Sequence, residues 1–504
     1  MSHDRHLHAQ TGAFRPGAVP VPGAAPIVSI AAGSVFGLAT LALYGLDVRW
    51  VVYVTAAVIC GTAVSFVRER QRFLMSAFIL SLQAGVYLRS FYGYAGSDGF
   101  ALSLPAVFGL PLLASQMLGV RTPGASRLQW GGRLTPWILG GLATSVIAFL
   151  FSSERFIGAT TIFSELQLYL MYLVALNTIR SKEELDVVGR CLLWSLIIQS
   201  LVYVIQNLYG INFNLVGEVT VRGDLPRPGG TVTSNPQGFA MFITPLWFIA
   251  VAMFLRGEKG RRSGGFVLCS VVLGVIDVIL TFTRAAWSGF AIGLVAFVAL
   301  TPVRRGIRLS RGVVVALAIG CFAAAFAPSI TARLAESTVS DAYDERAGLM
   351  RVAWSMIEAN PLVGVGPGAY RYTYRGFVPR DVEGQWLYAV HNKYLLRAAE
   401  VGVAGGVLYV LLLVAGLRQA LRLGKSHSPE VASMAAGWAA GLVALAWQMY
   451  WDPSFDFPYN ALLWFMLGLM ESMERLESHR PVEISVERDL YPAVLSITPA
   501  ATVG

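Results

Sequence analysis

Long apolar blocks alternate with short polar loops along most of the chain. Each block is about 17–23 residues long, the length that an α-helix needs to cross a hydrocarbon core about 30 Å thick. The pattern predicts a polytopic integral membrane protein of the all-α class, with about fourteen transmembrane helices. In chain order, the predicted spans are residues 27–45, 50–66, 73–91, 100–120, 136–152, 161–179, 188–210, 238–255, 265–281, 285–301, 312–328, 392–417, 430–450 and 458–473.

The composition agrees with this class and excludes others. Of the 504 residues, 55% are hydrophobic and 14% are charged, whereas a soluble domain carries about 25% charged residues. An ordinary soluble enzyme, a disordered chain and a disulfide-rich secreted domain are therefore excluded. The four cysteines lie within apolar blocks and lack the spacing of a metal site, so we interpret them as small buried side chains.

The basic residues predict the orientation of the chain in the membrane. With the N-terminus inside, the six inner loops hold 20 Lys and Arg residues, and the six short outer loops hold five. Because short cytoplasmic loops are enriched in Lys and Arg, this bias predicts that both termini are cytoplasmic. It also accounts for the net charge of +9 without nucleic acid as a partner.

Two longer polar stretches, residues 211–237 and 329–390, interrupt the pattern, and both fall on the outer face in this orientation. Long connections commonly carry function, so we expect the site there. The predicted organisation is a cytoplasmic tail at residues 1–26, N-terminal transmembrane helices at 27–155, a membrane core at 156–473 and a cytoplasmic tail at 474–504.

The first outer loop holds Arg222 and Arg227 among Gly and Pro residues and leads to Asn235-Pro236. Glycine lets a backbone approach a ligand closely, and arginine offers several hydrogen-bond donors. The loop is either a ligand-binding segment or a turn-rich connection with solvated arginines.

Arg284 lies between two long apolar runs. Such an arginine either marks a polar pathway or ligand, or extends its side chain to the membrane interface. Asp277 lies two turns earlier, on the same face if the helix is regular. An axial separation of about 10 Å argues against a direct pair.

The second outer loop contains a predicted amphipathic helix that carries Arg346 and Arg351 and ends at Asn360-Pro361. We expect this helix to pack on or beside the membrane face. The glycine-rich run 364–368 then predicts tight turns, whose amides either bind an anion or serve only the fold. The apolar positions that follow the helical period are 350, 353, 354 and 357.

The run His391-Asn392-Lys393-Tyr394 opens the next span. A histidine at a membrane entrance can accept a proton near neutral pH, as a general base must, or it can serve the structure alone. Glu400 lies nine residues further on, about 180° round a helix, and is a poor candidate to orient His391. We expect Glu400 to pair with Arg397 instead.

Several common signatures are absent from the sequence. There is no P-loop, no Asp-x-Asp motif and no paired Cys/His spacing, so we expect neither a metal nor a cofactor. A site on the outer face cannot reach cytoplasmic nucleotides. A lipid-linked donor is therefore the natural substrate.

Four segments occur in an order that resembles the bacterial O-antigen ligase/polymerase family. They are Arg227 leading to Asn235-Pro236, Thr283-Arg284-Ala285-Ala286-Trp287, Asn360 to Gly368, and His391-Asn392-x-Tyr394 with Glu400-x-Gly402. The resemblance covers about residues 160–470, and Thr283 stands where the family commonly has serine.

The resemblance implies a helical glycosyltransferase, similar to the lipid-donor (GT-C) class, in the bacterial inner membrane with its cleft facing the periplasm. Such enzymes pass a glycan from undecaprenyl diphosphate to an acceptor hydroxyl, without metal, in lipopolysaccharide or exopolysaccharide synthesis. By this resemblance, His391 would be the general base of an inverting transfer, and Asn392 and Tyr394 would shape the acceptor side. Arg227 and Arg284 would bind the diphosphate. Three further arginines would assist them, namely Arg222, Arg346 and Arg351.

Several alternatives stay open at this point. A polymerase extends the glycan on its lipid carrier, whereas a ligase moves it to lipid A–core; fourteen spans and a long outer loop favour polymerisation slightly. Expected partners are the lipid-linked donor, the glycan or lipid A–core acceptor, membrane lipids, a polysaccharide flippase and a chain-length regulator.

Two other functions compete with the enzyme. A flippase for lipid-linked glycans would need a charged central cavity, whereas we expect the charged residues within the spans (Asp277, Glu165 and Arg397) to be scattered. An envelope scaffold would not need His391. The last outer loop, with Asp452 and Asp456 among aromatic residues, either lines a sugar site or forms an interfacial belt.

Overall fold

A computed structural model of the protein describes residues 69–85, 87–89, 99–117, 128–210, 220–222, 225–233, 235–256, 261–300, 339–382, 389–453 and 457–478, with scattered positions between 312 and 331. The chain divides into two compact units, Met1–Leu74 and Met75–Gly504. All elements discussed below lie in the second unit, except the first residues of α3. The predicted spans 27–45 and 50–66 and part of 312–328 lie outside the described residues.

Helices dominate the described part of the chain, which confirms the all-α class. Two antiparallel hairpins, β1–β2 and β3–β4, accompany them. The elements are α3 (Arg70–Ser81), β1 (Tyr87–Arg89), β2 (Ala101–Ser103), α4 (Leu104–Met117), α5 (Thr135–Phe151), α6 (Arg155–Thr178), α7 (Lys182–Tyr209), β3 (Thr220–Arg222), β4 (Leu225–Arg227), α8 (Pro236–Arg256), α9 (Arg261–Leu280), α10 (Arg284–Leu300), α13 (Val339–Ala359), α14 (Tyr370–Thr373), η1 (Tyr374–Phe377), η2 (Arg380–Val382), α15 (Lys393–Leu423), α16 (Pro429–Tyr450) and α17 (Phe457–Ser478).

The predicted span count is not supported. Within the described residues, five helices are long and apolar enough to cross a membrane, namely α6, α7, α8, α15 and α16. Shorter apolar helices lie in α4, α5, α9 and α10. The chain is therefore a helical membrane protein, but the structure does not bear out a count of fourteen.

The predicted spans 73–91 and 100–120 are wrong as continuous helices. α3 ends at Ser81, and the next described segment, β1, pairs with β2, placing Leu88 opposite Leu102. The amide of Gly85 donates to the carbonyl of Thr231, 2.8 Å away, so the chain after α3 contacts a distant loop. An apolar run alone does not distinguish a buried helix from a strand, which explains the error.

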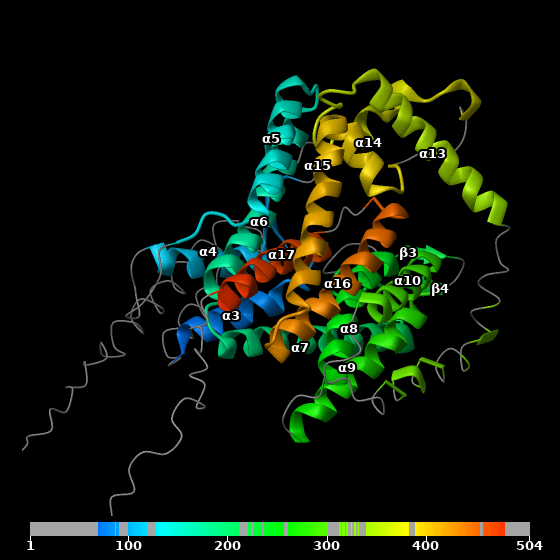
Figure 1. The fold of residues 1–504 in the computed structure, drawn as a ribbon. Coiled ribbons are helices and arrows are strands. Elements are labelled where there is room, and N and C mark those ends of the chain that lie inside the picture. Colours follow the sequence, from blue (N-terminus) through cyan, green and yellow to red (C-terminus); the bar gives the residue numbers. More distant parts are fainter. Residues whose placement is uncertain are drawn as a thin grey trace, which may run out of the picture. The chain divides into compact units, whose positions relative to one another are not determined.

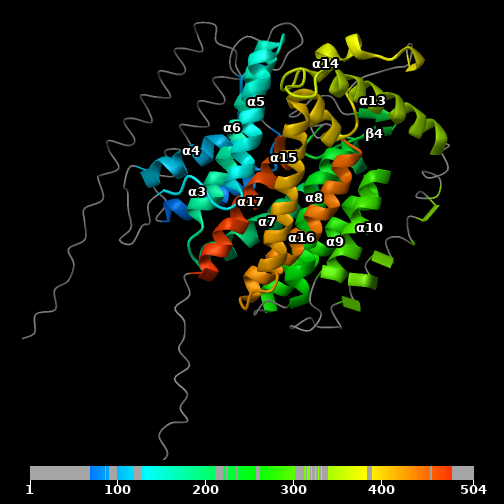
Figure 2. The ribbon, with the colours of Figure 1, turned by 45° about the horizontal axis from the view of Figure 1, so that its top comes forward.

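Helix α8 forms the centre of one group of packed helices, with α9, α10 and α16 around it (Figure 2). Its apolar window is entirely buried. Two glycines of α16 let the helices approach closely: a Cβ at Gly437 would lie 2.5 Å from the Cα of Ile249, and one at Gly441 2.7 Å from the Cα of Pro245. Small residues at such a crossing are typical of helix pairs in membranes.

A second group of helices packs on the other side of α15. α15 contacts α5 as well as α16, and α17 lies against α6 (Figure 1). α15 thus borders both groups.

The predicted amphipathic helix is confirmed as α13, and its last residue, Ala359, precedes Asn360-Pro361. It packs against the first turns of α15 through Ala353 and Met356, which lie in one buried cluster with Leu396 and Ala399. Trp354 is 53% exposed, so it lies outside the face that packs against α15. The buried face includes positions 349, 352 and 356, one helical turn apart, rather than 354.

Candidate active site

The structure places His391 immediately before α15. Asn392 is the N-cap of this helix, and its Oδ1 accepts hydrogen bonds from the amides of Tyr394 and Leu395, each at 3.0 Å. This cap satisfies amides that would otherwise lack partners and fixes the point where the helix begins. His391 is therefore held at a defined helix terminus and is half-buried.

The ring of His391 is oriented by the backbone. Its Nδ1 lies 3.1 Å from the carbonyl oxygen of Ala389. Because a carbonyl only accepts, this bond requires the proton on Nδ1, so Nε2 is the basic nitrogen of the neutral ring. That tautomer suits a general base.

The glycine-rich run 361–368 docks on a kink in α15. Val401 and Gly402 have non-helical backbone angles, with φ of +80° at Gly402. The carbonyl of Ala399 accepts from the amide of Val365 at 3.0 Å, and the carbonyl of Glu400 accepts from Gly366 at 2.9 Å. The amide of Val403 in turn donates to the carbonyl of Pro361 at 2.9 Å.

These bonds decide between the two interpretations of the run. The amides of Gly364, Val365 and Gly366 are all used by backbone carbonyls and serve the fold, whereas the amide of Gly368 donates to an anion of the protein itself, the carboxylate of Glu400. The contact also requires glycine. A Cβ at Gly364 would lie 2.4 Å from the carbonyl oxygen of Glu400, and one at Gly402 2.2 Å from that of Leu362.

The C-terminal end of α16 brings several predicted segments together. The hydroxyl of Tyr394, in the first turn of α15, donates to the carbonyl of Ala446 at 2.8 Å. The indole of Trp447 donates to the hydroxyl of Ser288, in the second turn of α10, at 2.8 Å. The amide of Gln237, in the first turn of α8, lies 3.5 Å from Gln448. The segments carrying His391 and Arg284 thus meet at one helix end.

Arg284 is the first residue of α10 and is half-buried. α9 ends at Leu280, and the chain turns through Phe282, whose φ is +46°. The helix is therefore interrupted between Asp277 and Arg284, and the two residues do not share one regular helix face. Asp277 accepts a hydrogen bond from Ser200 of α7 instead.

Arg222 and Arg227 lie on a hairpin that the sequence did not reveal. Arg222 is opposite Leu225, and Arg227 is opposite Thr220. Asn235 follows, and its side chain accepts from the amide of Gly238 at 2.8 Å, which caps α8 at Pro236. Because Gln237 contacts Gln448, the start of α8 lies near the end of α16, as the starts of α10 and α15 do. Helix N-termini carry partial positive charge and favour anions.

Arg346 of α13 reaches the same helix end, with its guanidinium 5.3 Å from the ring centroid of Trp451. Trp451 lies against Tyr450, with ring centroids 4.9 Å apart, and against Trp447 at 6.0 Å. Arg351 pairs instead with Asp381, and both side chains are about half exposed. Asp452 interacts electrostatically with Lys393, and Asp456 lies outside the described residues.

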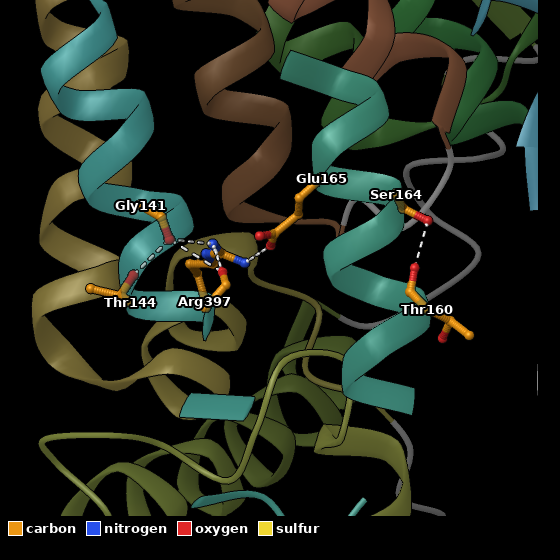
Figure 3. Close-up of polar contacts among 7 residues, drawn as sticks. Gly141, Thr144, Thr160, Ser164, Glu165 and Arg397 are labelled. Atoms are coloured by element: carbon orange, nitrogen blue, oxygen red, sulfur yellow. Dashed lines mark hydrogen bonds and ion pairs between the residues drawn. The ribbon is translucent and has the colours of Figure 1, made fainter. Parts of the chain in front are cut away.

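A second polar centre lines a cavity of about 490 Å³ bounded by α5, α6, α15 and α17. Arg397 forms an ion pair with Glu165 of α6, and these side chains are only 14% and 12% exposed. Figure 3 shows Arg397 reaching between α5 and α6, where it also bonds to Ser145 at 2.7 Å and to the carbonyl of Gly141 at 3.4 Å.

This ion pair corrects two predictions. The ion pair of Arg397 is with Glu165, where a pair with Glu400 was predicted, although Arg397 also interacts electrostatically with Glu400. The charges of Glu165 and Arg397 are therefore not scattered. Glu400 accepts backbone hydrogen bonds from Gly368 and Tyr370 and interacts electrostatically with Lys393. Burial, and next the nearby Glu400 carboxylate, raise the pKa of Tyr370, so its hydroxyl stays neutral.

The described helices define a helical membrane protein. Its candidate site is the C-terminal end of α16, together with the helix starts that lie near it. Residues 269–410 match the family model described as O-antigen ligase. The match supports the predicted resemblance to the O-antigen ligase/polymerase family for this part of the chain. It includes both Arg284 and His391. No curated protein matches the chain significantly.

Proposed function

We propose that this protein transfers a glycan from undecaprenyl diphosphate to an acceptor hydroxyl at the periplasmic face of the inner membrane, without a metal and with inversion. The observation that carries the proposal is the meeting of the His391 and Arg284 segments at the end of α16, through Tyr394 and Ser288. A base and a cation for the leaving group are both needed at one reacting carbon.

In the proposed reaction, Nε2 of His391 takes the proton of the acceptor hydroxyl as its oxygen bonds to the anomeric carbon. The bond from that carbon to the diphosphate oxygen breaks, and its electron pair leaves with undecaprenyl diphosphate. The imidazolium then returns its proton to water. Attack opposite the leaving group converts an α-linked donor into a β-linked product.

The leaving diphosphate needs stable positive charge beside lipid. Arg284 begins a helix, so its guanidinium and the amides of that N-terminus present positive charge from the same place. An arginine side chain bonds to phosphate through two nitrogens at once. We assign Arg227, on the hairpin before α8, to the same diphosphate, with Arg222, Arg346 and Arg351 assisting.

Reconstitution with an undecaprenyl-diphosphate-linked repeat unit as the sole sugar substrate tests the proposal. Lengthening of the lipid-linked glycan, lost in His391→Ala, would identify a polymerase; transfer only after addition of lipid A–core would identify a ligase. The slight preference for a polymerase depends partly on a count of fourteen spans, which the structure does not support. The assay therefore decides between a polymerase and a ligase. No transfer in either arm would contradict the enzyme and favour the flippase.

A further inference from the structure

The cavity between α5, α6, α15 and α17 is separate from the residues assigned to the reaction. Neither His391 nor Arg284 lines it, although Lys393, two residues after His391, does. Its volume of about 490 Å³ falls in the range of roughly 300–1,000 Å³ that is typical of small-molecule sites. Arg371 and Tyr372 line it and are exposed, so it opens beside α14.

The charges in the cavity are nearly balanced. Arg397 pairs with Glu165, and Lys393 interacts with Glu400, which leaves Arg371 as the one further charged residue among its described lining. Such a wall does not present the concentrated positive charge that a diphosphate needs. It presents donors and acceptors side by side, which suits a neutral ligand with many hydroxyl groups.

Two further features point to the same ligand chemistry. Trp137, Tyr409 and Trp464 line the cavity, and their flat faces can pack against the C–H faces of a sugar ring. One carboxylate oxygen of Glu165, Oε2, is buried and accepts no hydrogen bond from any described residue. A buried acceptor of this kind calls for a donor, and a ligand hydroxyl supplies one once the neighbouring side chains shift to uncover this oxygen.

We propose that this cavity binds a neutral sugar unit of the acceptor glycan. Lys393 connects the two sites, because it lines the cavity and begins the helix that His391 precedes. A sugar held there extends the acceptor toward the base. The assignment to the acceptor rests on the proposed function, whereas binding of the glycan is measurable without turnover.

Gly141 provides a sharp test of the site. It lines the cavity, and a Cβ built on it meets no atom within 4 Å, so a larger side chain there enters open space. Gly265 of α9 is a matched control, because it is also a helical glycine whose Cβ meets nothing within 4 Å and it lies outside the cavity. We compare Gly141→Phe with Gly265→Phe in lipid nanodiscs, after checking that each variant keeps the wild-type melting temperature.

The probe is the glycan released by mild acid from the lipid-linked pool of the cells that make this protein. Binding is followed by tryptophan fluorescence, since Trp137 and Trp464 line the cavity. We expect wild type and Gly265→Phe to bind with one Kd, and Gly141→Phe to bind at least tenfold more weakly. An unchanged Kd in folded Gly141→Phe, or no binding by wild type, would overturn the proposal.

A second variant covers the case in which Gly141→Phe fails to fold. Glu165→Gln keeps the size of the side chain but removes the charge that faces Arg397, and we expect a loss of affinity of fivefold or more. Glu474→Gln is its control, because Glu474 pairs with Arg133 at 2.8 Å outside the cavity. Equal Kd values for these two variants would also count against the site.

The two proposals fail in different ways. If the wild-type protein binds the glycan but does not transfer it, the sugar site is supported and the proposed transfer reaction is refuted. Transfer by Gly141→Phe with an unchanged acceptor KM would keep the enzyme and refute the sugar site.

Discussion

Two arginines, one within α15 and one at the start of α10, have opposite surroundings. Arg397 is buried and paired with Glu165, so its charge is matched within the protein. Arg284 makes no ion pair with any described residue and begins a helix. A matched arginine offers hydrogen bonds without net charge, whereas an unmatched one offers charge to a ligand. The comparison separates a region suited to sugar hydroxyls from one suited to a diphosphate.

The largest expected effect is that of His391→Ala. Loss of a general base lowers turnover by about 10²–10⁴-fold, and we expect a loss of that size in the reconstituted assay. The melting temperature should stay close to that of wild type, because Asn392 still caps α15. Near-normal turnover in a folded variant would show that His391 is not the general base. The diphosphate region around Arg284 would then have no assigned base.

Gly364→Ala tests the docking of the glycine-rich run on α15. Gly364 has a φ of +67°, and its Cβ would meet the backbone of Glu400. We expect a loss of unfolding free energy of about 2 kcal/mol or more, measured by thermal unfolding in detergent. Gly376→Ala is the control, since a Cβ there meets nothing within 4 Å; equal stability of the two variants would contradict the docking.

Arg284→Lys sharpens the comparison directly. Lysine keeps the charge but lacks the planar fork that bonds to two phosphate oxygens, so we expect about a ten- to hundredfold loss of kcat/KM for the lipid donor. Arg133→Lys, in an exposed ion pair with Glu474, should change it less than twofold. If both variants behaved alike, the diphosphate role of Arg284 would be withdrawn.

Tyr394→Phe should have the smallest effect. It removes the 2.8 Å hydrogen bond to the carbonyl of Ala446 and should cost about 0.5–1.5 kcal/mol of unfolding free energy. Because this bond holds the start of α15 against α16, we also expect a few-fold loss of kcat. A variant with lower stability and unchanged kcat would show that Tyr394 serves the fold alone.

The helices were predictable where apolar residues form long runs, because burial in a membrane requires a helix of a known length. The predicted spans 238–255 and 430–450 match α8 and α16 closely. The same reasoning failed at 73–91, where the run also contains a strand.

The site was only partly predictable. The order of Arg284, the glycine-rich run and His391 pointed to the family whose model matches residues 269–410. Spacing along one helix could not reveal that Arg397 pairs with Glu165, because the partners are 232 residues apart. The role of the end of α16 was also missed, although the aromatic run Trp447, Tyr450 and Trp451 was a visible signal.

The kink in α15 has a consequence for how the protein tolerates different bilayers. The carbonyls of Ala399 and Glu400 bond to the run 361–368 rather than to the next turn of their own helix. The short segment that follows His391 is therefore bonded to this run, and it is also held to α16 through Tyr394 and to α6 through Arg397. The long part of α15 is bonded to the same run through the amide of Val403. A tilt of that part in a thicker or thinner membrane is therefore passed on to the segment that carries His391, so we expect the distance between base and substrate to respond to lipid thickness.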